Sequence, residues 1–453
     1  MKKAKIYYFT LTDEMRKEEK LAWFSEMKFN DIPFEHIQPD KNSNWINLTD
    51  NDWDEMIPTI NYDVKHGNIS NTIFKIFSNG IATNRDFWVY DINKDDLINK
   101  VKHFIRIYND LIKTNNRSFP DIIKWSHAFK KKFLNGKKLI FDENKITQVY
   151  YRPFKIMYYY CDFDMSDLLT STHFVMHGAN LKNSNQSIWF KCGITSYFFS
   201  LGINKVTDIM PNGGSKCLPL YRYDESGNKL ENITDWGLKQ FRSRYEGPPS
   251  KKRGLGGVSK SSDNTPGNSH TPLSPIDRGE IQKEDVFYYT YGVLHNPAYR
   301  KKYELNLKRE FPRLPFYENF YQWRDWGKQL MDLHIGFEQA EKFPLELRDT
   351  GYDKAHEPKA KLRANKEQGI IILDEQTELH GIPKEAWDYK LGNRSALEWI
   401  IDQYKEKKPR DPTIREKFNT YRFADYKDKV IELLMRVTTV SIETVKIVRE
   451  MEK

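Results

Sequence analysis

Cysteine and long apolar runs are what this chain most clearly lacks. It has 453 residues but three cysteines, Cys161, Cys192 and Cys217, which lie far apart and form no CxxC pair. A disulfide scaffold is therefore excluded. No apolar run approaches the roughly 20 residues that a membrane-spanning helix needs. Residues 1–30 carry charges throughout and have no signal-peptide core. The composition fits a soluble protein of a reducing compartment.

The sequence also lacks the motifs of several enzyme classes. It contains no GxxxxGK(S/T) phosphate loop and no GxGxxG that follows a strand. The GxSxG nucleophile elbow is missing, as is the (D/N/S)PP(Y/F/W) tetrapeptide that holds the target amino group in amino-methyltransferases. We therefore expect this chain to have no catalysis of its own.

Aromatic residues and a mild excess of positive charge are what the sequence has instead. Aromatics make up 14% of the residues, which argues against disorder for most of the chain. Lys and Arg number 72 against 63 Asp and Glu, a net charge of +9. A basic excess permits nucleic-acid binding without proving it. The length corresponds to roughly two to four domains.

The first half of the chain predicts helices at its start and strands towards its middle. Residues 14–28 and 94–114 have helical patterns, and in the second the apolar residues repeat at three and four. FKIF and FWVY (74–77 and 87–90) read as two strands, with Asn79-Gly80 as a turn. Further strands are predicted from β-branched and aromatic residues at 138–141, 146–151, 187–200 and 217–224.

The second half predicts a linker and then mostly helices. Residues 246–279 are rich in Gly, Pro and Ser, so we expect a flexible surface loop. Helices follow at 283–311, broken at Asn296-Pro297, and at 327–343, 395–404 and 428–451. Residues 348–380 read as irregular with one short strand at 369–373. The predicted fold class is α+β, with antiparallel strands in the middle and a helical C-terminal part.

Three patterns in the sequence are those of metal sites or of a nuclease. His173 and His177 have the spacing of a zinc pair, but no matching Cys pair or HExxH lies nearby. The acidic run that contains Asp162, Asp164 and Asp167 fails as a calcium loop, because Asp167 stands where Gly is required. The remaining pattern formally fits a PD…(D/E)xK nuclease that binds Mg²⁺. It consists of Asp121, Glu143 and Lys145.

Three polar and aromatic segments offer groups that suit nucleic acid. SNGIATNRDFW places Asn84 and Arg85 at a loop tip, and these side chains can read adenine and guanine edges. VYYRPFKIMYYY and IMPNGGSKCLPLY carry groups that suit phosphates. The alternative for each segment is that its tyrosines enter a core and its charges face solvent. The candidate phosphate contacts are Arg152, Lys155 and Lys216, and Asn212 is a further candidate DNA contact.

Taken in order, these segments resemble the C-terminal target-recognition region of Type ISP restriction–modification enzymes. The most specific stretches are residues 285–316 and YKLGNRSALEWIIDQY at 389–404. Weaker ones are IFSNGIATNRDFWVYD at 76–91 and YRPF at 151–154. The family consists of single-chain bacterial anti-phage proteins that join a nuclease, a helicase-like ATPase, an adenine-N6 methyltransferase and this region. The other matching stretches are NGGSKCLPLY at 212–221 and VSIETVKIV at 440–448.

The resemblance implies sequence-specific recognition of double-stranded DNA in the bacterial cytoplasm. S-adenosylmethionine, ATP and Mg²⁺ are then expected only in missing domains or in a methyltransferase, ATPase and nuclease partner chain. Residues 1–30 resemble the helix that joins the methyltransferase to the recognition region, and we expect residues 1–45 to be this linker helix and the tail of a methyltransferase domain. We expect a recognition core at 46–345 and a helical C-terminal subdomain at 346–453. A stand-alone Mg²⁺ nuclease and a scaffold without a DNA role remain as alternatives.

Overall fold

The computed structural model describes most of the chain, with gaps. The described residues are 4–12, 15–39, 45, 51–67, 71–114, 118–192, 197–210, 214–247, 279–349 and 358–453. Most of the predicted loop at 246–279, from residue 248 to 278, lies outside them, as does Asn212. Within these ranges no helix is long and apolar enough to cross a membrane.

Helices begin and end close to the sequence signals at most predicted positions. Asn93 caps the helix that follows it by accepting from the backbone N–H groups of Asp95 and Asp96. Asn296 caps the helix that begins at Pro297 in the same way, which explains the predicted break. The α-helices are α1 (Lys17–Glu26), α2 (Asp86–Val89), α3 (Lys94–Lys113), α4 (His127–Leu134), α5 (Ser171–His177), α6 (Asp235–Tyr245), α7 (Lys283–Val293), α8 (Pro297–Lys302), α9 (Glu304–Leu307), α10 (Phe320–Ile335), α11 (Ala396–Gln403), α12 (Pro412–Lys417) and α13 (Lys427–Glu450).

Short antiparallel strands form the described sheets. Two sheets have four strands, in the orders β4-β10-β8-β9 and β14-β17-β16-β15, and one has three, in the order β5-β7-β6. The pairs β1-β2, β3-β13 and β11-β12 complete the set. The strands are β1 (Ile6–Tyr8), β2 (Glu35–Ile37), β3 (Ile57–Pro58), β4 (Ser78–Asn79), β5 (Tyr90–Asp91), β6 (Ile146–Arg152), β7 (Lys155–Tyr160), β8 (Ser187–Lys191), β9 (Phe199–Ile203), β10 (Ser215–Pro219), β11 (Tyr221–Tyr223), β12 (Lys229–Glu231), β13 (Arg313–Leu314), β14 (Glu346–Asp349), β15 (Ala360–Asn365), β16 (Ile370–Asp374) and β17 (Thr377–His380). This arrangement confirms the predicted α+β class.

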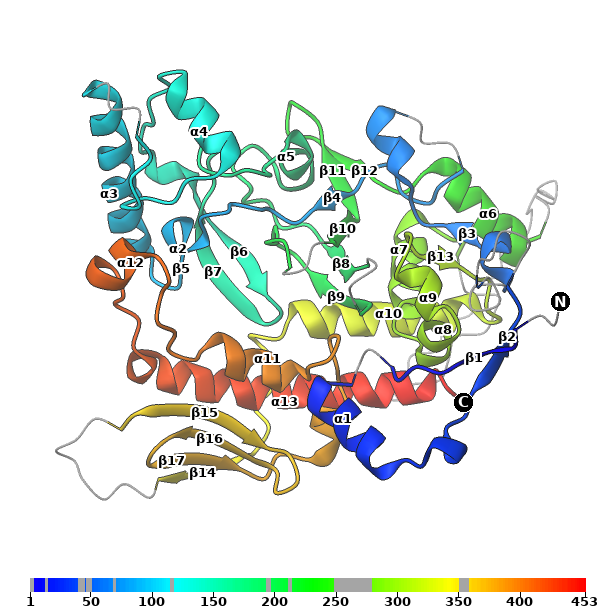
Figure 1. The fold of residues 1–453 in the computed structure, drawn as a ribbon. Coiled ribbons are helices and arrows are strands. Elements are labelled where there is room, and N and C mark those ends of the chain that lie inside the picture. Colours follow the sequence, from blue (N-terminus) through cyan, green and yellow to red (C-terminus); the bar gives the residue numbers. More distant parts are fainter. Residues whose placement is uncertain are drawn as a thin grey trace, which may run out of the picture.

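Three apolar cores hold these elements together (Figure 1). One lies under α3, α4 and the β5-β7-β6 sheet, and a second surrounds α7 and α10. The third joins β8 and β9 to α11 and α13 and to the four-stranded sheet of β14 to β17. Figure 1 shows α13 running across the lower part of the molecule, below α10 and above that sheet.

Some predicted elements are wrong. FWVY is not a strand, because Thr83 accepts from the Arg85 backbone N–H and its hydroxyl bonds Asp86, so a helical turn, α2, begins there. FKIF forms no strand, and KLIF at 138–141 is irregular. Asn79 pairs with Lys216 in a sheet instead of turning. Residues 348–380 were predicted to be irregular, but their described part forms most of a four-stranded sheet.

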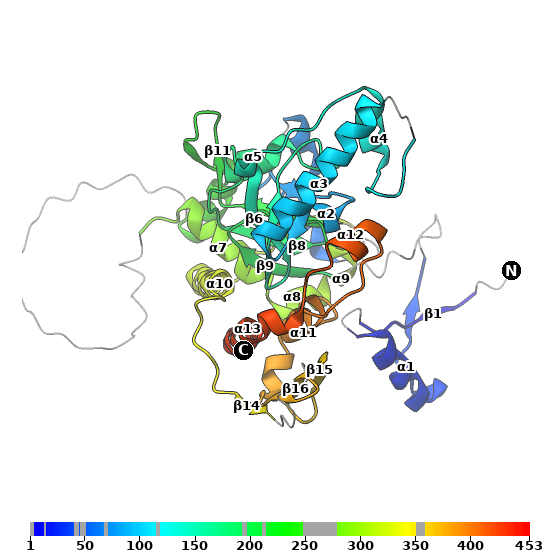
Figure 2. The ribbon, with the colours of Figure 1, turned by 90° about the vertical axis from the view of Figure 1, so that its left-hand side faces the viewer.

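The division of the chain at residues 45 and 345 stays a prediction. The N-terminal module, which comprises β1, α1 and β2, lies to one side of the body in Figure 2. None of the residues of α1 is buried. One described tie to the body is the ion pair of Arg16 with Glu398, at 2.6 Å.

The crossing of α7 and α10 depends on glycine. A Cβ atom on Gly327 would lie 1.8 Å from the carbonyl oxygen of Tyr288, and one on Gly292 would lie 2.5 Å from that of Trp323. Both contacts are with backbone, which cannot move aside without separating the helices.

We predict that Gly327→Ala lowers the free energy of unfolding by about 1–3 kcal/mol or more, because overpacking strains a close-packed core. Urea denaturation of the full chain measures this. Gly279→Ala is the control, since no heavy atom lies within 4 Å of its added Cβ. Equal stability of the two variants would contradict the close crossing.

Candidate nucleic-acid interface

Two adjoining clefts lie where the 82–88 segment meets the C-terminal part of the chain. The first has a volume of about 920 Å³ and is lined by residues 82–88, by parts of 119–130 and by 410–412. The second, of about 660 Å³, is lined by residues around β5 and β7 and by parts of 393–421. The clefts share four lining residues and are called the groove from here on. The shared residues are Asp86, Phe87, Arg152 and Met210.

Residues 82–87, the Asn84 loop, present two exposed side chains to the groove. Asn84 has a left-handed backbone, with φ of 55°, and its Nδ2 donates to Asp167 Oδ2 at 2.6 Å. Phe87 is 48% exposed, which is unusual for a large apolar side chain. Hydrogen bonds hold the neighbouring residues Arg85 and Trp88 in place. The loop therefore presents Asn84 and Phe87 in a fixed arrangement.

Arg85 is a buried anchor of this loop. It is 2% exposed, and its guanidinium donates to Met165 O at 2.6 Å, to Ser126 Oγ at 2.8 Å and to Asp167 Oδ1 at 3.1 Å. It also lies over the ring of Phe129, at 4.3 Å from the centroid. Burial lowers the pKa of Arg85, and Asp167 opposes this shift. A guanidinium engaged in this way is not free to read a base.

Arg152 and Lys155 are likewise engaged inside the protein. The hairpin of β6 and β7 turns through Pro153 and Phe154, and Phe154 is buried in the core. Arg152 pairs with Asp208 at 2.6 Å, and Tyr90 Oη donates to the same carboxylate at 3.0 Å. The Lys155 ammonium lies 3.3 Å from the ring centroid of Tyr404, and burial holds its pKa well below the usual value. Both line the groove, but neither projects as a surface cation.

The remaining predicted contact, Lys216, lines neither cleft of the groove. It stands on β10, and its Nζ donates to Asn79 Oδ1 at 2.6 Å. Burial lowers the pKa of Lys216. Asn212 lies outside the described residues. Of the six predicted DNA contacts, Asn84 is therefore the one that the structure places exposed in the groove.

The nuclease pattern is not assembled as its chemistry requires. Glu143 pairs with Lys94 at 2.6 Å on the surface, and Lys145 pairs with Asp162 at 2.6 Å. Asp121 is exposed at the first cleft. In the ranges that the structure describes, no group of three or more His, Cys, Asp or Glu side chains is arranged to hold a metal ion.

The two histidines with zinc spacing serve the local structure. Each ring contacts a backbone carbonyl: His173 Nε2 lies 2.9 Å from Asn79 O, and His177 Nδ1 lies 3.1 Å from Asn183 O. Burial lowers the pKa of His177 to about 4. Both rings are therefore neutral near pH 7.

Comparison with known proteins identifies the family. A family model described as the Type ISP C-terminal specificity domain matches residues 72–433. The chain belongs to this family. The match confirms the resemblance predicted from the sequence, and it leaves the N-terminal module outside this Type ISP specificity domain.

Solved structures resemble the Type ISP specificity domain over nearly the whole chain. DrdV, solved by cryo-EM as a complex with DNA, is 38% identical with a TM-score of 0.79, over 98% of this chain and 43% of DrdV. A nuclease-deletion mutant of the Type ISP restriction–modification enzyme LlaGI, in complex with a DNA substrate mimic, is 24% identical with a TM-score of 0.71, over 99% of this chain and 39% of LlaGI. The ATP-dependent Type ISP enzyme LlaBIII, bound to DNA, is 23% identical with a TM-score of 0.72, over 93% and 25%.

The chain spans less than half the length of each of these three structures. No curated protein matches it.

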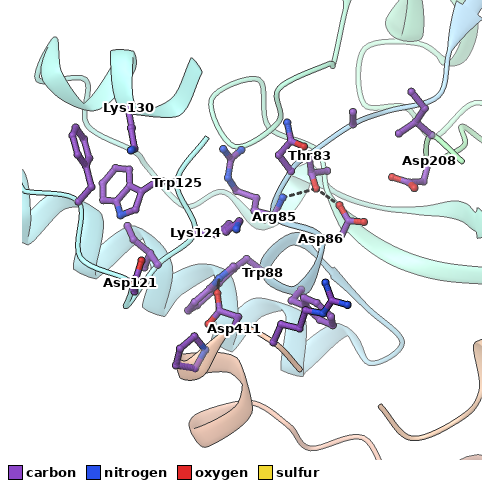
Figure 3. A pocket seen from close by; sticks show the side chains of 18 of the residues that line it. Thr83, Arg85, Asp86, Trp88, Asp121, Lys124, Trp125, Lys130, Asp208 and Asp411 are labelled. Carbon is purple, nitrogen blue, oxygen red and sulfur yellow. Dashed lines mark hydrogen bonds between the residues drawn. The ribbon is translucent and has the colours of Figure 1, made fainter. Parts of the chain in front are cut away.

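Sequence reasoning missed several groove residues of the Type ISP specificity domain. Lys124 is exposed at the first cleft, Lys130 lies over the ring of Phe119, and Arg410 approaches from the C-terminal part of the chain. Figure 3 shows Lys130 on the side of the pocket opposite Asp208, with Lys124 between them. Two basic runs in the sequence contain residues of this set: KKK at 130–132 contains Lys130, and KEKKPR at 405–410 contains Arg410.

We predict that Asp208→Asn lowers the free energy of unfolding by about 3–5 kcal/mol, because it leaves the buried charge of Arg152 without a counter-charge. The side chains are 2% and 10% exposed. Burial raises the pKa of Asp208 to about 7, and the charge of Arg152 opposes this shift.

Chemical denaturation of Asp208→Asn and of the double variant Arg152→Met with Asp208→Asn measures this. The double variant should lose less stability, because no unpaired charge remains. Glu143→Gln, in the exposed pair with Lys94, should leave stability unchanged within error. Equal losses in the single and double variants would contradict the charge argument.

Proposed function

We propose that this specificity domain recognises a sequence in double-stranded DNA on behalf of a larger restriction–modification enzyme. The observation that carries the proposal is the Asn84 loop, which holds an exposed amide and an exposed aromatic ring in a groove with cationic walls. DNA recognition needs such a combination, since phosphate contacts position a protein and base contacts specify the sequence. The solved relatives bound to DNA support the same reading.

Asn84 is the proposed polar base reader. One hydrogen of its Nδ2 is used by Asp167, which fixes the orientation of the amide. The other hydrogen and Oδ1 have no partner in the described part of the chain, so the side chain retains one donor and one acceptor. An asparagine with both groups available can contact N6 and N7 of adenine together. Asp167 thus acts as a positioning residue.

Phe87 is the proposed apolar reader. It is three residues beyond Asn84 and shares the wall of both clefts. The following residue, Trp88, is buried and donates its indole N–H to Asp411, so the helical turn that carries Phe87 is fixed. An exposed phenylalanine in a cationic groove suits contact with the methyl group of thymine.

Arg85, Arg152 and Lys155 enter this proposal as residues that position the loop and the groove wall, not as DNA contacts. Exposed Lys124, together with the partly buried Lys130, replaces them as the phosphate contact on this side of the groove. Asn212 and Lys216 remain predicted contacts of the 211–216 segment.

We predict that Asn84→Ala and Phe87→Ala each relax the preferred sequence at one position while the chain still binds DNA. A bidentate amide contributes about 1–3 kcal/mol of discrimination, which corresponds to roughly 5- to 150-fold. Selection from random duplex DNA by the purified full chain, followed by sequencing, measures the preference of each variant.

Matched controls are Asn144→Ala and Ile140→Ala, an exposed amide and an exposed apolar residue outside the groove. These should leave the selected sequence unchanged. If the parent chain enriches no sequence, the proposed function is wrong. If both groove variants select the parent's sequence, the assignment of Asn84 and Phe87 is wrong although DNA recognition stands.

Catalysis is proposed to lie in the rest of the enzyme or in partner chains. The chain corresponds to 43% or less of each of the three solved structures named above. Methylation with S-adenosylmethionine, ATP hydrolysis and Mg²⁺-dependent cleavage would then belong to those other parts. The expected role is defence against phage DNA in the bacterial cytoplasm.

The N-terminal module is the proposed contact with the methyltransferase. Its rings pack on one another, with Phe9 and Trp23 stacked at 5.1 Å and Phe29 and Phe34 at 5.5 Å between centroids. The module nevertheless leaves large apolar side chains exposed, so it lacks a covering surface. The exposed side chains are Tyr7, Leu21, Phe24, Phe29, Phe34 and Trp45, the last of which lies just beyond β2.

We predict that deleting residues 1–40 abolishes co-purification with the methyltransferase of the same restriction system and leaves the stability of the remaining chain nearly unchanged. The reason is that α1 buries no residue against the body. Pull-down and thermal denaturation measure the two effects. Phe24→Ala with Phe29→Ala should weaken binding without the deletion. Retained pull-down, or a large loss of stability, would show that the module belongs to the body.

A further inference from the structure

Residues 405–417, called the strap, connect the C-terminal part of the chain to the elements around α3. The strap follows α11 and includes α12. Its Asp411 Oδ2 accepts from the indole N–H of Trp88 at 2.8 Å, and Thr413 Oγ1 donates to Ile122 O at 2.9 Å. Ile414 is 3% exposed and packs in the same core as α3. The C-terminal half of the strap is therefore fixed against the elements around α3.

The strap forms one wall of both clefts. Arg410, Asp411 and Pro412 line the first, and Lys405 and Lys407 line the second. In Figure 3, Asp411 lies beside Trp88, at the base of the Asn84 loop. Figure 1 shows α12 next to α2 and α3, far along the chain from both. The strap thus shares the groove with the proposed base readers.

The strap carries more positive than negative charge. Its sequence, KEKKPRDPTIREK, contains six basic and three acidic residues. Two of the acids are used internally: Asp411 bonds Trp88 and the backbone N–H of Ile414, and Glu406 accepts from Phe423 N at 2.8 Å. Lys408 and Arg410 are exposed and, within the described residues, neither has a carboxylate at ion-pair distance.

We propose that the strap is a phosphate clamp that holds the DNA backbone across the groove from the Asn84 loop. This inference rests on the proposed function and assigns the backbone contact to a segment outside the predicted recognition core. Fixed cations without partners suit phosphates, since each contact releases condensed counterions. The hydrogen bond from Trp88 to Asp411 keeps the strap at a fixed position relative to Asn84 and Phe87.

A solvated basic run would have the same composition but a different arrangement. Surface lysines that serve solubility need no anchoring of the segment that carries them. Here a buried isoleucine, a threonine hydroxyl and an aspartate fix the strap against the N-terminal elements. The arrangement holds Arg410 at the first cleft and Lys405 and Lys407 at the second, with the exposed Lys408 between them in the chain.

The test is the double variant Lys408→Ala with Arg410→Ala in the full chain, with Lys239→Ala and Lys301→Ala together as control. Lys239 and Lys301 are exposed on α6 and α8, away from the groove in Figure 1. Fluorescence anisotropy gives the affinity for the selected duplex and for a scrambled duplex from about 50 to about 200 mM salt. Thermal denaturation confirms that all variants are folded.

The strap variant should lose affinity for both duplexes alike and keep the parent's sequence preference. Two lost phosphate contacts reduce the salt slope by about 1.8, so its affinity should fall about 12-fold less than the parent's over that salt range. The control should keep the parent's slope.

An unchanged slope in the strap variant, with DNA still bound, would overturn the clamp and leave the proposed function intact. An equal change in the control would also overturn it, because the effect would then be one of net charge. Failure of the parent to bind DNA would overturn the proposed function and the clamp with it.

Discussion

The buried guanidinium of Arg85 is the interaction on which the groove depends. Taking a charge out of water costs several kcal/mol unless partners replace the lost hydration. Here Asp167, Ser126 and the carbonyl of Met165 do so, and the ring of Phe129 covers one face. These partners come from different segments of the chain, so a single side chain joins the loop to α4 and to the 162–170 turn. Because Arg85 cannot leave without exposing this network, the residues on either side of it are fixed.

A second tie, between Trp88 and Asp411, sets the width of the groove. It joins the start of the sequence-reading region to a segment more than 300 residues later. Together with Ile414 in the core around α3, it makes the two walls one rigid unit. Preorganised walls avoid the entropy of ordering a loop when DNA binds, so more of the contact energy appears as affinity.

Sequence periodicity predicted the long elements well, and for a clear reason. The helices α3 and α13 have one apolar face over many turns, and Asn93 and Asn296 mark helix starts chemically. Short elements were missed where side-chain hydrogen bonds and packing, and not the strand or helix preference of the residues, decide the backbone. FWVY has strand-forming residues, but hydrogen bonds from Thr83 turn it into α2. The strand β15 alternates charged residues with a buried Leu362, so its sequence reads as irregular.

The site was harder to predict than the fold because residue type does not reveal burial. Arg85 and Lys408 have similar chemistry, yet the structure places the first inside a network and the second in solvent. From the sequence alone, an arginine beside an asparagine at a loop tip suits base reading. The structure shows instead that Arg85 pairs with Asp167, which lies more than 80 residues away in the chain. Lone phenylalanines carry no sequence signal at all, and Phe87 becomes a candidate only once its exposure and the two clefts are known.

The residue that holds the loop in place, Arg85, is different from the proposed base contacts, Asn84 and Phe87, and this affects how sequence specificity can change. If Arg85 contacted a base, any change of target sequence would require changing the residue that holds the loop together. Since the guanidinium of Arg85 is buried and its Nη1 and Nη2 groups donate inside the protein, Asn84 and Phe87 can be replaced while the loop, the strap and the groove keep their shape. The shape of the groove and its attraction for the DNA backbone then stay constant. The preference for one DNA sequence over another changes with the two exposed side chains. A recognition domain built in this way can acquire a new target sequence without first losing its fold.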